Sequence, residues 1–150
     1  MKFLIAGLGS IGRRHLNNLK TLGETDLLLY RTRRSTLPEA ALSGLPVYTD
    51  LNDALAQRPD GVIISNPTFA HLGVGLPAAE VGCNLLIEKP ISASREKLPE
   101  LKAALQNHHK QALIGYQFRF HPVLQQIKTL LDSGALGNPL SAEAHWGEYL

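Results

Sequence analysis

The chain begins with Lys2-Phe3-Leu4-Ile5-Ala6-Gly7-Leu8-Gly9-Ser10-Ile11-Gly12, in which an apolar run of strand length leads into Gly-x-Gly-x-x-Gly. An amphipathic stretch follows at once, so the expected order is strand, tight turn and helix. Gly7 permits the sharp turn, Gly9 lets the backbone approach a pyrophosphate, and Gly12 lets the helix pack closely on the strand. We therefore predict that this segment binds a dinucleotide, with the phosphates at the N-terminus of the helix. The alternative is an ordinary strand, turn and helix without a ligand.

Composition excludes several classes of protein. The chain has 150 residues, about the length of one domain, and its 44% hydrophobic and 19% charged residues are typical of a globular protein. A formal net charge of +2 is too small to indicate nucleic acid or a membrane as a partner. The one cysteine, Cys83, excludes an internal disulfide and suits a reducing compartment, so we expect a structural thiol in a cytoplasmic protein. The sequence contains no cluster of Cys and His residues that would indicate a metal site.

Strand-type and helix-type segments alternate as far as about residue 120. After the first strand and helix, we expect strands at residues 26–31, 47–48, 62–65, 85–87 and 112–116. We expect helices at residues 38–42, 51–57 (capped by Asp50), 68–81 and, after a cap at Ser94, a helix that carries Leu98, Leu101 and Leu105. This alternation predicts the α/β class, with a doubly wound parallel sheet of the Rossmann type. Its ligands bind at the carboxyl ends of the strands.

The character of the sequence changes after His121. Val123, Ile127 and Leu130 lie at helical spacing, and residues 141–146 alternate in period two as in a half-buried strand. One strand cannot form a stable sheet by itself. We therefore expect residues 1–121 to form the dinucleotide-binding domain, and residues 122–150 to begin a second domain whose remainder is absent.

Several stretches together resemble the glucose–fructose oxidoreductase/inositol dehydrogenase (Gfo/Idh/MocA) family. They are Gly7-Leu8-Gly9-Ser10-Ile11-Gly12-Arg13-Arg14-His15, Ser65-Asn66-Pro67-Thr68-Phe69-Ala70-His71, Glu88-Lys89-Pro90-Ile91-Ser92 and Gly115-Tyr116-Gln117-Phe118-Arg119-Phe120-His121-Pro122. Members of this family are mostly NAD(P)-dependent oxidoreductases that act on sugars, polyols and related compounds. The resemblance implies hydride transfer between a nicotinamide and a hydroxyl carbon or carbonyl of a small-molecule substrate.

The resemblance also implies a larger second α/β domain, which binds substrate and through which we expect a homo-oligomer. The family's second catalytic motif, an Asp with a His four residues later, belongs to that domain, and no Asp-x-x-x-His occurs here. We therefore expect the 150 residues to be part of a protein about twice as long, and to be inactive alone.

Lys89 is the predicted catalytic residue. An ammonium at the end of a strand, facing the nicotinamide, can donate a hydrogen bond to the substrate oxygen and stabilise charge that develops there. Spacing alone favours a surface lysine before a proline; the Glu-Lys-Pro match to the family favours the catalytic role. Glu88 is expected to orient Lys89 or the cofactor.

The end of the second strand decides the choice of cofactor. An acidic residue there would bind the ribose 2′-hydroxyl of NAD, but Tyr30-Arg31-Thr32-Arg33-Arg34 contains none. A guanidinium matches a phosphate bidentately, so we predict NADP(H) as the preferred cofactor and NAD(H) as the alternative. Arg31 and one of Arg33 or Arg34 would bind the 2′-phosphate, with Thr32 adding a hydroxyl. The other interpretation is a solvated basic loop.

The loop after the fourth strand is expected along the ribose and nicotinamide. Two simpler interpretations stay open, that Thr68 caps the next helix and that His71 is structural. By resemblance, Tyr116 and Arg119 are assigned to the substrate pocket, while Arg119 could instead support a domain junction. The full set expected at the cofactor is Gly7, Gly9, Ser10, Ile11, Gly12, Arg31, Thr32, Arg34, Asn66, Pro67, Thr68, His71, Glu88 and Lys89.

Two other functions are consistent with the same sequence. The first is a dinucleotide-binding module without catalysis, such as a sensor of the redox cofactor. The second is an assembly protein that uses the helix and strand after residue 121, which predicts oligomers that form independently of the cofactor.

Overall fold

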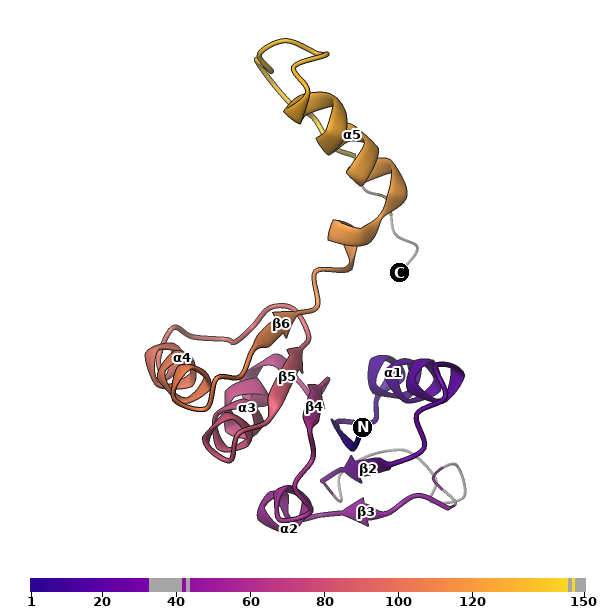
Figure 1. Cartoon of the computed structure of the whole chain (residues 1–150), viewed down its shortest axis with the longest axis vertical. Helices are drawn as coiled ribbons and strands as arrows, with labels where there is room; N and C mark the ends of the chain where they lie inside the picture. Colours follow the sequence, from indigo (N-terminus) through magenta and orange to yellow (C-terminus); the bar gives the residue numbers. More distant parts are fainter. Residues whose placement is uncertain (33–41, 43, 146, 148–150) are drawn as a thin grey trace. The chain divides into compact units, whose positions relative to one another are not determined.

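The sheet at the centre of the first part of the chain contains six parallel strands in the order β3-β2-β1-β4-β5-β6 (Figure 1). The strands are β1 (Phe3–Ala6), β2 (Leu27–Tyr30), β3 (Val47–Tyr48), β4 (Gly61–Ile64), β5 (Asn84–Ile87) and β6 (Ala112–Ile114). The order reverses between β1 and β4, and such a switch point opens a crevice at the carboxyl ends of the strands. The predicted doubly wound parallel sheet is confirmed.

The computed structural model describes residues 1–32, 42, 44–145 and 147. The chain divides into two compact units, Met1–Gly115 and Tyr116–Leu150. The boundary that we expected after residue 121 therefore falls inside the second unit. None of the helices in the described ranges is long and apolar enough to cross a membrane.

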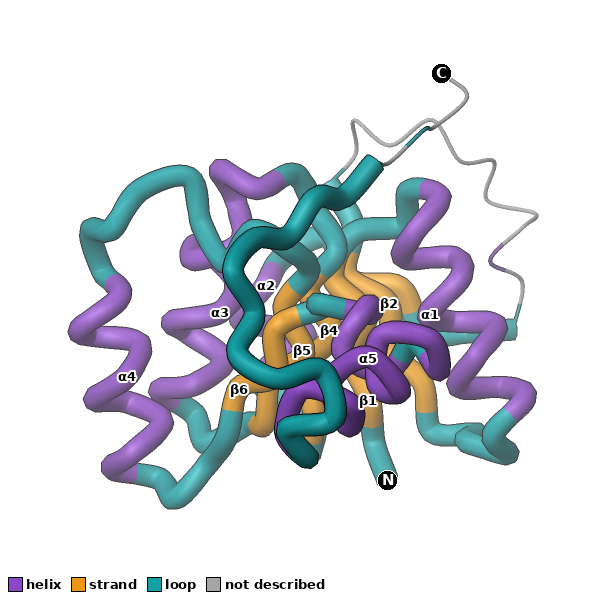
Figure 2. The backbone as a smooth tube through the Cα atoms, turned by 90° about the horizontal axis from the view of Figure 1, so that it is seen from above, coloured by secondary structure: helices purple, strands orange, loops and turns teal. Residues whose placement is uncertain are grey.

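Helices cover both faces of the sheet, and Figure 2 shows the strands between them. In the first unit they are α1 (Ser10–Thr21), α2 (Leu51–Leu55), the 3₁₀ turn η2 (Thr68–Ala70), α3 (His71–Glu80) and α4 (Leu98–Asn107). Successive strand residues point to opposite faces, so each strand feeds two cores. Ile5 and Ile63 join the core that contains Leu16 of α1. Leu4 and Val62 join the core that contains side chains of α2, α3 and α4.

Two predicted helix caps have different outcomes. The Asp50 carboxylate accepts hydrogen bonds from the backbone N–H groups of Asn52 at 2.7 Å and Asp53 at 3.2 Å, which confirms this cap. The Ser94 cap is wrong, because α4 begins only at Leu98, after Lys97 in a left-handed conformation. Pro99 explains the late start, since proline lacks an N–H and is tolerated only in the first turn of a helix.

The second unit contains the 3₁₀ turn η3 (Gln117–Phe120) and α5 (Pro122–Asp132). The predicted amphipathic helix is thus confirmed, but residues 141–145 form no strand. The reason is physical: a strand needs a hydrogen-bonded neighbour, and these residues have none within the described part of this unit. Trp146 and most of the helix expected at residues 38–42 lie outside the described residues.

Candidate cofactor-binding site

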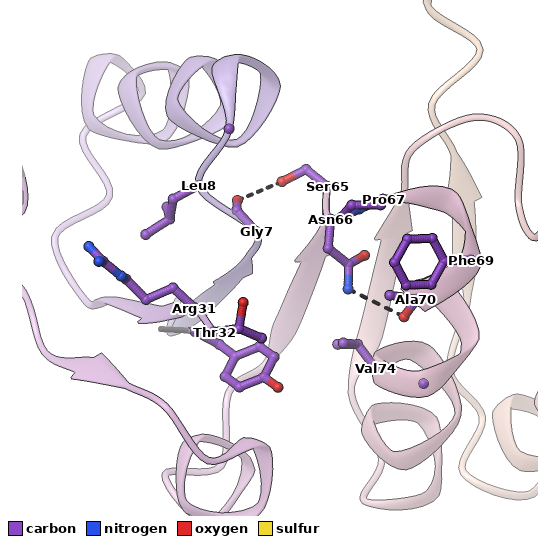
Figure 3. Close-up of a pocket in the computed structure, with 13 residues that line it drawn as sticks. Gly7, Leu8, Arg31, Thr32, Ser65, Asn66, Pro67, Phe69, Ala70 and Val74 are labelled. Atoms are coloured by element: carbon purple, nitrogen blue, oxygen red, sulfur yellow. Dashed lines mark hydrogen bonds between the residues drawn. The ribbon is translucent and has the colours of Figure 1, made fainter. Parts of the chain in front are cut away.

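A cleft of about 1040 Å³ opens at the carboxyl ends of β1, β2 and β4 (Figure 3). Figure 3 shows Leu8 and Arg31 on one side of it and Phe69, Ala70 and Val74 on the other. Its lining residues are Gly7, Leu8, Gly9, Tyr30, Arg31, Thr32, Ser65, Asn66, Pro67, Phe69, Ala70, Gly73 and Val74. Three loops that are far apart in sequence therefore meet at the position that the sheet order predicts.

The glycines of the first turn differ in what surrounds them. Gly7 has a φ of +93°, and a Cβ there would lie 2.5 Å from the backbone N of Asn66. A Cβ on Gly12 would collide with the carbonyl oxygen of Gly7 and lie 2.7 Å from Ser65 Oγ. A Cβ on Gly9 would meet nothing within 4 Å, so open space lies above this residue. The turn is therefore closed on the protein side and open on the ligand side.

The N-terminus of α1 is free to receive an anion. The helix begins at Ser10, Gly9 is the residue before it, and no side chain caps the end. The first backbone N–H groups of a helix lack partners within the helix, and the helix dipole adds positive charge at this end. Ile11 is 40% exposed and lies in the first turn. This end of α1 can hold a pyrophosphate through backbone N–H groups alone.

The end of β2 supplies the polar side of the cleft. Its lining residues there are Tyr30, Arg31 and Thr32, and the Arg31 backbone N–H donates to Tyr48 O at 3.0 Å. This bond extends the β2–β3 pairing to Arg31. The other expected contacts, Arg33 and Arg34, lie outside the described residues.

The loop after β4 is tied to the glycine turn. Ser65 Oγ donates to Gly7 O at 2.9 Å. Asn66 Nδ2 donates to Ala70 O at 3.3 Å, while the buried Asn66 Oδ1 has no hydrogen-bond partner among the described residues. Thr68 begins η2 and does not cap α3, whose first residue is preceded by Ala70 without a side-chain cap. The capping alternative for Thr68 is therefore wrong.

His71 lies beneath this loop. Its side chain is 1% exposed; Nδ1 is 3.0 Å from Pro90 O, and Nε2 is 2.8 Å from Asn66 O. The imidazole thus connects the loop after β4 to the loop after β5, and it is not part of the cleft lining. These contacts favour the structural interpretation of His71.

Glu88 follows β5 and is held by His15, a residue for which we predicted no role. His15 Nε2 of α1 lies 2.8 Å from Glu88 Oε1, and both side chains are about four-fifths buried (19% and 21% exposed). A Cβ on Gly115 would lie 3.1 Å from Glu88 Oε2, so the carboxylate rests against the backbone after β6. The sequence marks His15 only by its position, three residues after Gly12 and at the end of the first stretch that resembles the family.

Lys89 is exposed, follows Glu88 after the end of β5, and is joined to Pro90 by a cis peptide bond. It has no hydrogen bond or ion pair within the described part of the chain, and it does not line the cleft. Tyr116 and Arg119 belong to the second unit. Their assignment to the substrate, like that of Lys89 to catalysis, stays a prediction.

The surroundings of the Cys83 thiol favour the structural role that we expected. It is 2% exposed, and Sγ donates to Pro59 O at 3.2 Å. Burial raises the pKa of this thiol, because desolvation disfavours the thiolate. Among the described residues, no group of three or more His, Cys, Asp or Glu side chains is placed to hold a metal ion.

Known proteins resemble this chain in sequence, over most of its length. Inositol 2-dehydrogenase of Corynebacterium glutamicum is 30% identical over 144 residues, a match that covers 91% of this chain and 42% of that protein. D-xylose 1-dehydrogenase (NADP+) of Haloarcula marismortui is 29% identical, over 85% of this chain and 37% of that protein. The chain thus spans about two fifths of the length of these curated relatives.

A solved structure shares the arrangement as well. The WlbA dehydrogenase of Chromobacterium violaceum, in complex with NADH and UDP-GlcNAcA, superposes with a TM-score of 0.81 at 26% identity. The match covers 91% of this chain and 41% of that one. The model of the oxidoreductase family with an NAD-binding Rossmann fold matches residues 1–116, which include the glycine turn, the cleft and the Glu-Lys-Pro loop. The chain therefore belongs to the Gfo/Idh/MocA oxidoreductase family.

Proposed function

We propose that this chain is the cofactor-binding part of an NADP(H)-preferring oxidoreductase. The enzyme would transfer a hydride between the nicotinamide and a sugar, a sugar derivative or a polyol. One observation carries the proposal: in a chain of this oxidoreductase family, the glycine turn and the uncapped start of α1 border a formed cleft. The names of its relatives, an inositol 2-dehydrogenase and a D-xylose 1-dehydrogenase (NADP+), support the substrate class.

The residues present fit a dinucleotide. Open space above Gly9 and an uncapped helix end suit the pyrophosphate, and a cleft of about 1040 Å³ suits a ligand of this size. Ser10, Ile11 and Gly12 would bind the phosphates through the backbone. Asn66 and Pro67 would border the riboses from the loop after β4.

Preference for NADP(H) is supported by the residues at the end of β2. Arg31 and Thr32 line the cleft, and the sequence of residues 30–34 contains no acidic residue to bind a free 2′-hydroxyl. A guanidinium and a hydroxyl would instead hold the 2′-phosphate, with Arg34 as the second arginine. NAD(H) would bind in the same cleft without this contact.

Lys89 would act at the substrate. A bound nicotinamide would supply or accept the hydride, and the Lys89 ammonium would donate a hydrogen bond to the reacting oxygen and stabilise its negative charge. Glu88, held by His15 at 2.8 Å, would fix the backbone from which Lys89 projects. Tyr116 and Arg119 would contact the substrate. A second domain would complete the pocket and form a homo-oligomer, and we propose the cytoplasm as its location.

Calorimetric titration with NADPH and with NADH tests this function. We expect NADPH to bind at least about tenfold more tightly, as a charge-assisted contact of ~1.5–3 kcal/mol would give. Arg31→Asp should remove the preference, whereas Arg95→Asp, the same charge change at an exposed residue outside the cleft, should keep it. Equal binding of both cofactors would contradict the 2′-phosphate assignment alone. A folded chain that binds neither would contradict the proposed function.

A further inference from the structure

Phe69 lies at the edge of the cleft with its side chain largely in solvent. It is the second residue of η2, it lines the cleft, and it is 79% exposed. The Phe69 ring is not part of the hydrophobic core, because Phe69 belongs to neither of the two clusters of buried side chains. An exposed aromatic ring beside a pocket is a candidate surface for a planar ligand group.

The residues next to Phe69 form a surface on which a flat ring can rest. Ala70 and Gly73 line the same side of the cleft, and a Cβ on Gly73 would meet nothing within 4 Å. The turn that carries Phe69 is held in place, because Asn66 Nδ2 donates to Ala70 O and the Ala70 backbone N–H donates to Pro67 O at 2.8 Å. The ring is therefore exposed on an anchored backbone, beside space that side chains leave open.

The other residues of the cleft identify which half of the cofactor would lie there. The lining includes Arg31 and Thr32, which follow β2 and would read the ribose of the adenosine. It does not include Glu88 or Lys89 of the loop after β5, where the substrate is expected. Figure 3 shows Phe69 on the side of the cleft opposite Arg31.

We propose that Phe69 is the stacking surface for the adenine ring, and thus a cofactor-affinity residue. This inference rests on the proposed function, since it requires that the cleft bind a dinucleotide. Aromatic side chains stack on bases through their faces, so the contact recognises the base and is indifferent to the 2′-phosphate. Phe69 should therefore strengthen NADPH and NADH binding by the same factor.

Half-molecules of the cofactor provide the test. We expect Phe69→Ala to weaken ADP-ribose and NADPH by about tenfold each, the size typical of one base–aromatic stack. Binding of nicotinamide mononucleotide should stay unchanged, and Phe69→Trp should restore the affinity for ADP-ribose. Leu22→Ala is the matched control, because Leu22 is 78% exposed and lies outside the cleft.

Three other outcomes would contradict this inference, and the last of them would also contradict the proposed function. Equal ADP-ribose affinity in wild type and Phe69→Ala would overturn the stacking role while leaving the proposed function intact. A loss confined to nicotinamide mononucleotide would place Phe69 at the other half of the cofactor and overturn the adenine assignment. A wild-type chain that binds no dinucleotide would overturn both this inference and the proposed function.

Discussion

Helices α1 and α5 have similar apolar patterns but different surroundings. In α1, Leu16 and Leu19 are buried against the sheet, at 5% and 8% exposed. In α5, the apolar residues at the same spacing are exposed, with Ile127 at 43% and Leu130 at 39%, and none of the described residues of the second unit is buried. Apolar periodicity thus predicts a helix in both places, whereas burial depends on what packs against it.

The two units also differ in how their polar contacts span the sequence. In the first unit, His15 and Glu88 are joined across a separation of 73 residues. In the described part of the second unit, the Lys128–Asp132 ion pair and the contact between His145 Nε2 and Glu143 Oε1 span four residues or fewer. Contacts that join distant segments make folding cooperative, so we expect the first unit to carry the stability of this chain.

The largest expected difference in stability is between two matched truncations of an apolar side chain, one in α1 and one in α5. We expect Leu16→Ala to lower the free energy of unfolding by ~2–5 kcal/mol, because it leaves a cavity in a packed core. Ile127→Ala should change it by less than ~0.5 kcal/mol, as at most surface sites. Urea unfolding followed by circular dichroism measures both. Comparable losses would show that the apolar face of α5 is covered in solution.

A smaller difference in stability is expected between alanine substitutions at two glycines of the same turn, Gly12 and Gly9. Gly12→Ala adds a Cβ that collides with Gly7 O, so we expect a loss of ~1–3 kcal/mol of stability, as for overpacked cores. Gly9→Ala meets open space and should leave stability within ~0.5 kcal/mol of wild type. Thermal unfolding gives these values. Calorimetry should show that both variants bind NADPH more weakly; unchanged binding by Gly9→Ala would mean that no phosphate approaches this backbone.

The contact between His15 and Glu88 tests whether contacts between distant segments stabilise the first unit. We expect His15→Ala to cost about 1 kcal/mol, the usual net value of a hydrogen bond between partly buried groups. Asn17→Ala provides a control at an exposed position of the same helix. Chemical denaturation of the two variants measures the difference. Equal stabilities would mean that the pair positions the loop after β5 without stabilising the fold.

The sequence was sufficient where local rules act alone. Buried strands, the glycine turn and the Asp50 cap each follow from residues next to one another, and all three are present. Partners distant in sequence could not be read in this way. His15 gives no sign that it meets Glu88, because no local pattern encodes a contact that only the completed sheet creates.

Ser94 and residues 141–146 show the two ways in which local patterns fail. Ser94 is a good helix cap by residue type, but Pro99 excludes a helix that starts there. Residues 141–145 alternate as a strand does, yet pairing is a property of the neighbouring strand and not of the segment itself. The glycine turn beside the cleft was predictable because its glycines are constrained locally, whereas the proposed role of Phe69 depends on which loops face each other across the cleft.

The smallest effect concerns the local ion pair of α5. Lys128 Nζ and Asp132 Oδ2 are 2.5 Å apart, four residues along the helix, with both side chains largely exposed (74% and 62%). We expect Lys128→Ala to change the stability of the whole chain by no more than ~0.3–0.5 kcal/mol, because exposed pairs at this spacing contribute little. The change should be smaller than that for His15→Ala in the same denaturation experiment. A larger loss for Lys128→Ala would show that α5 unfolds together with the first unit, which would remove the distinction between the two units.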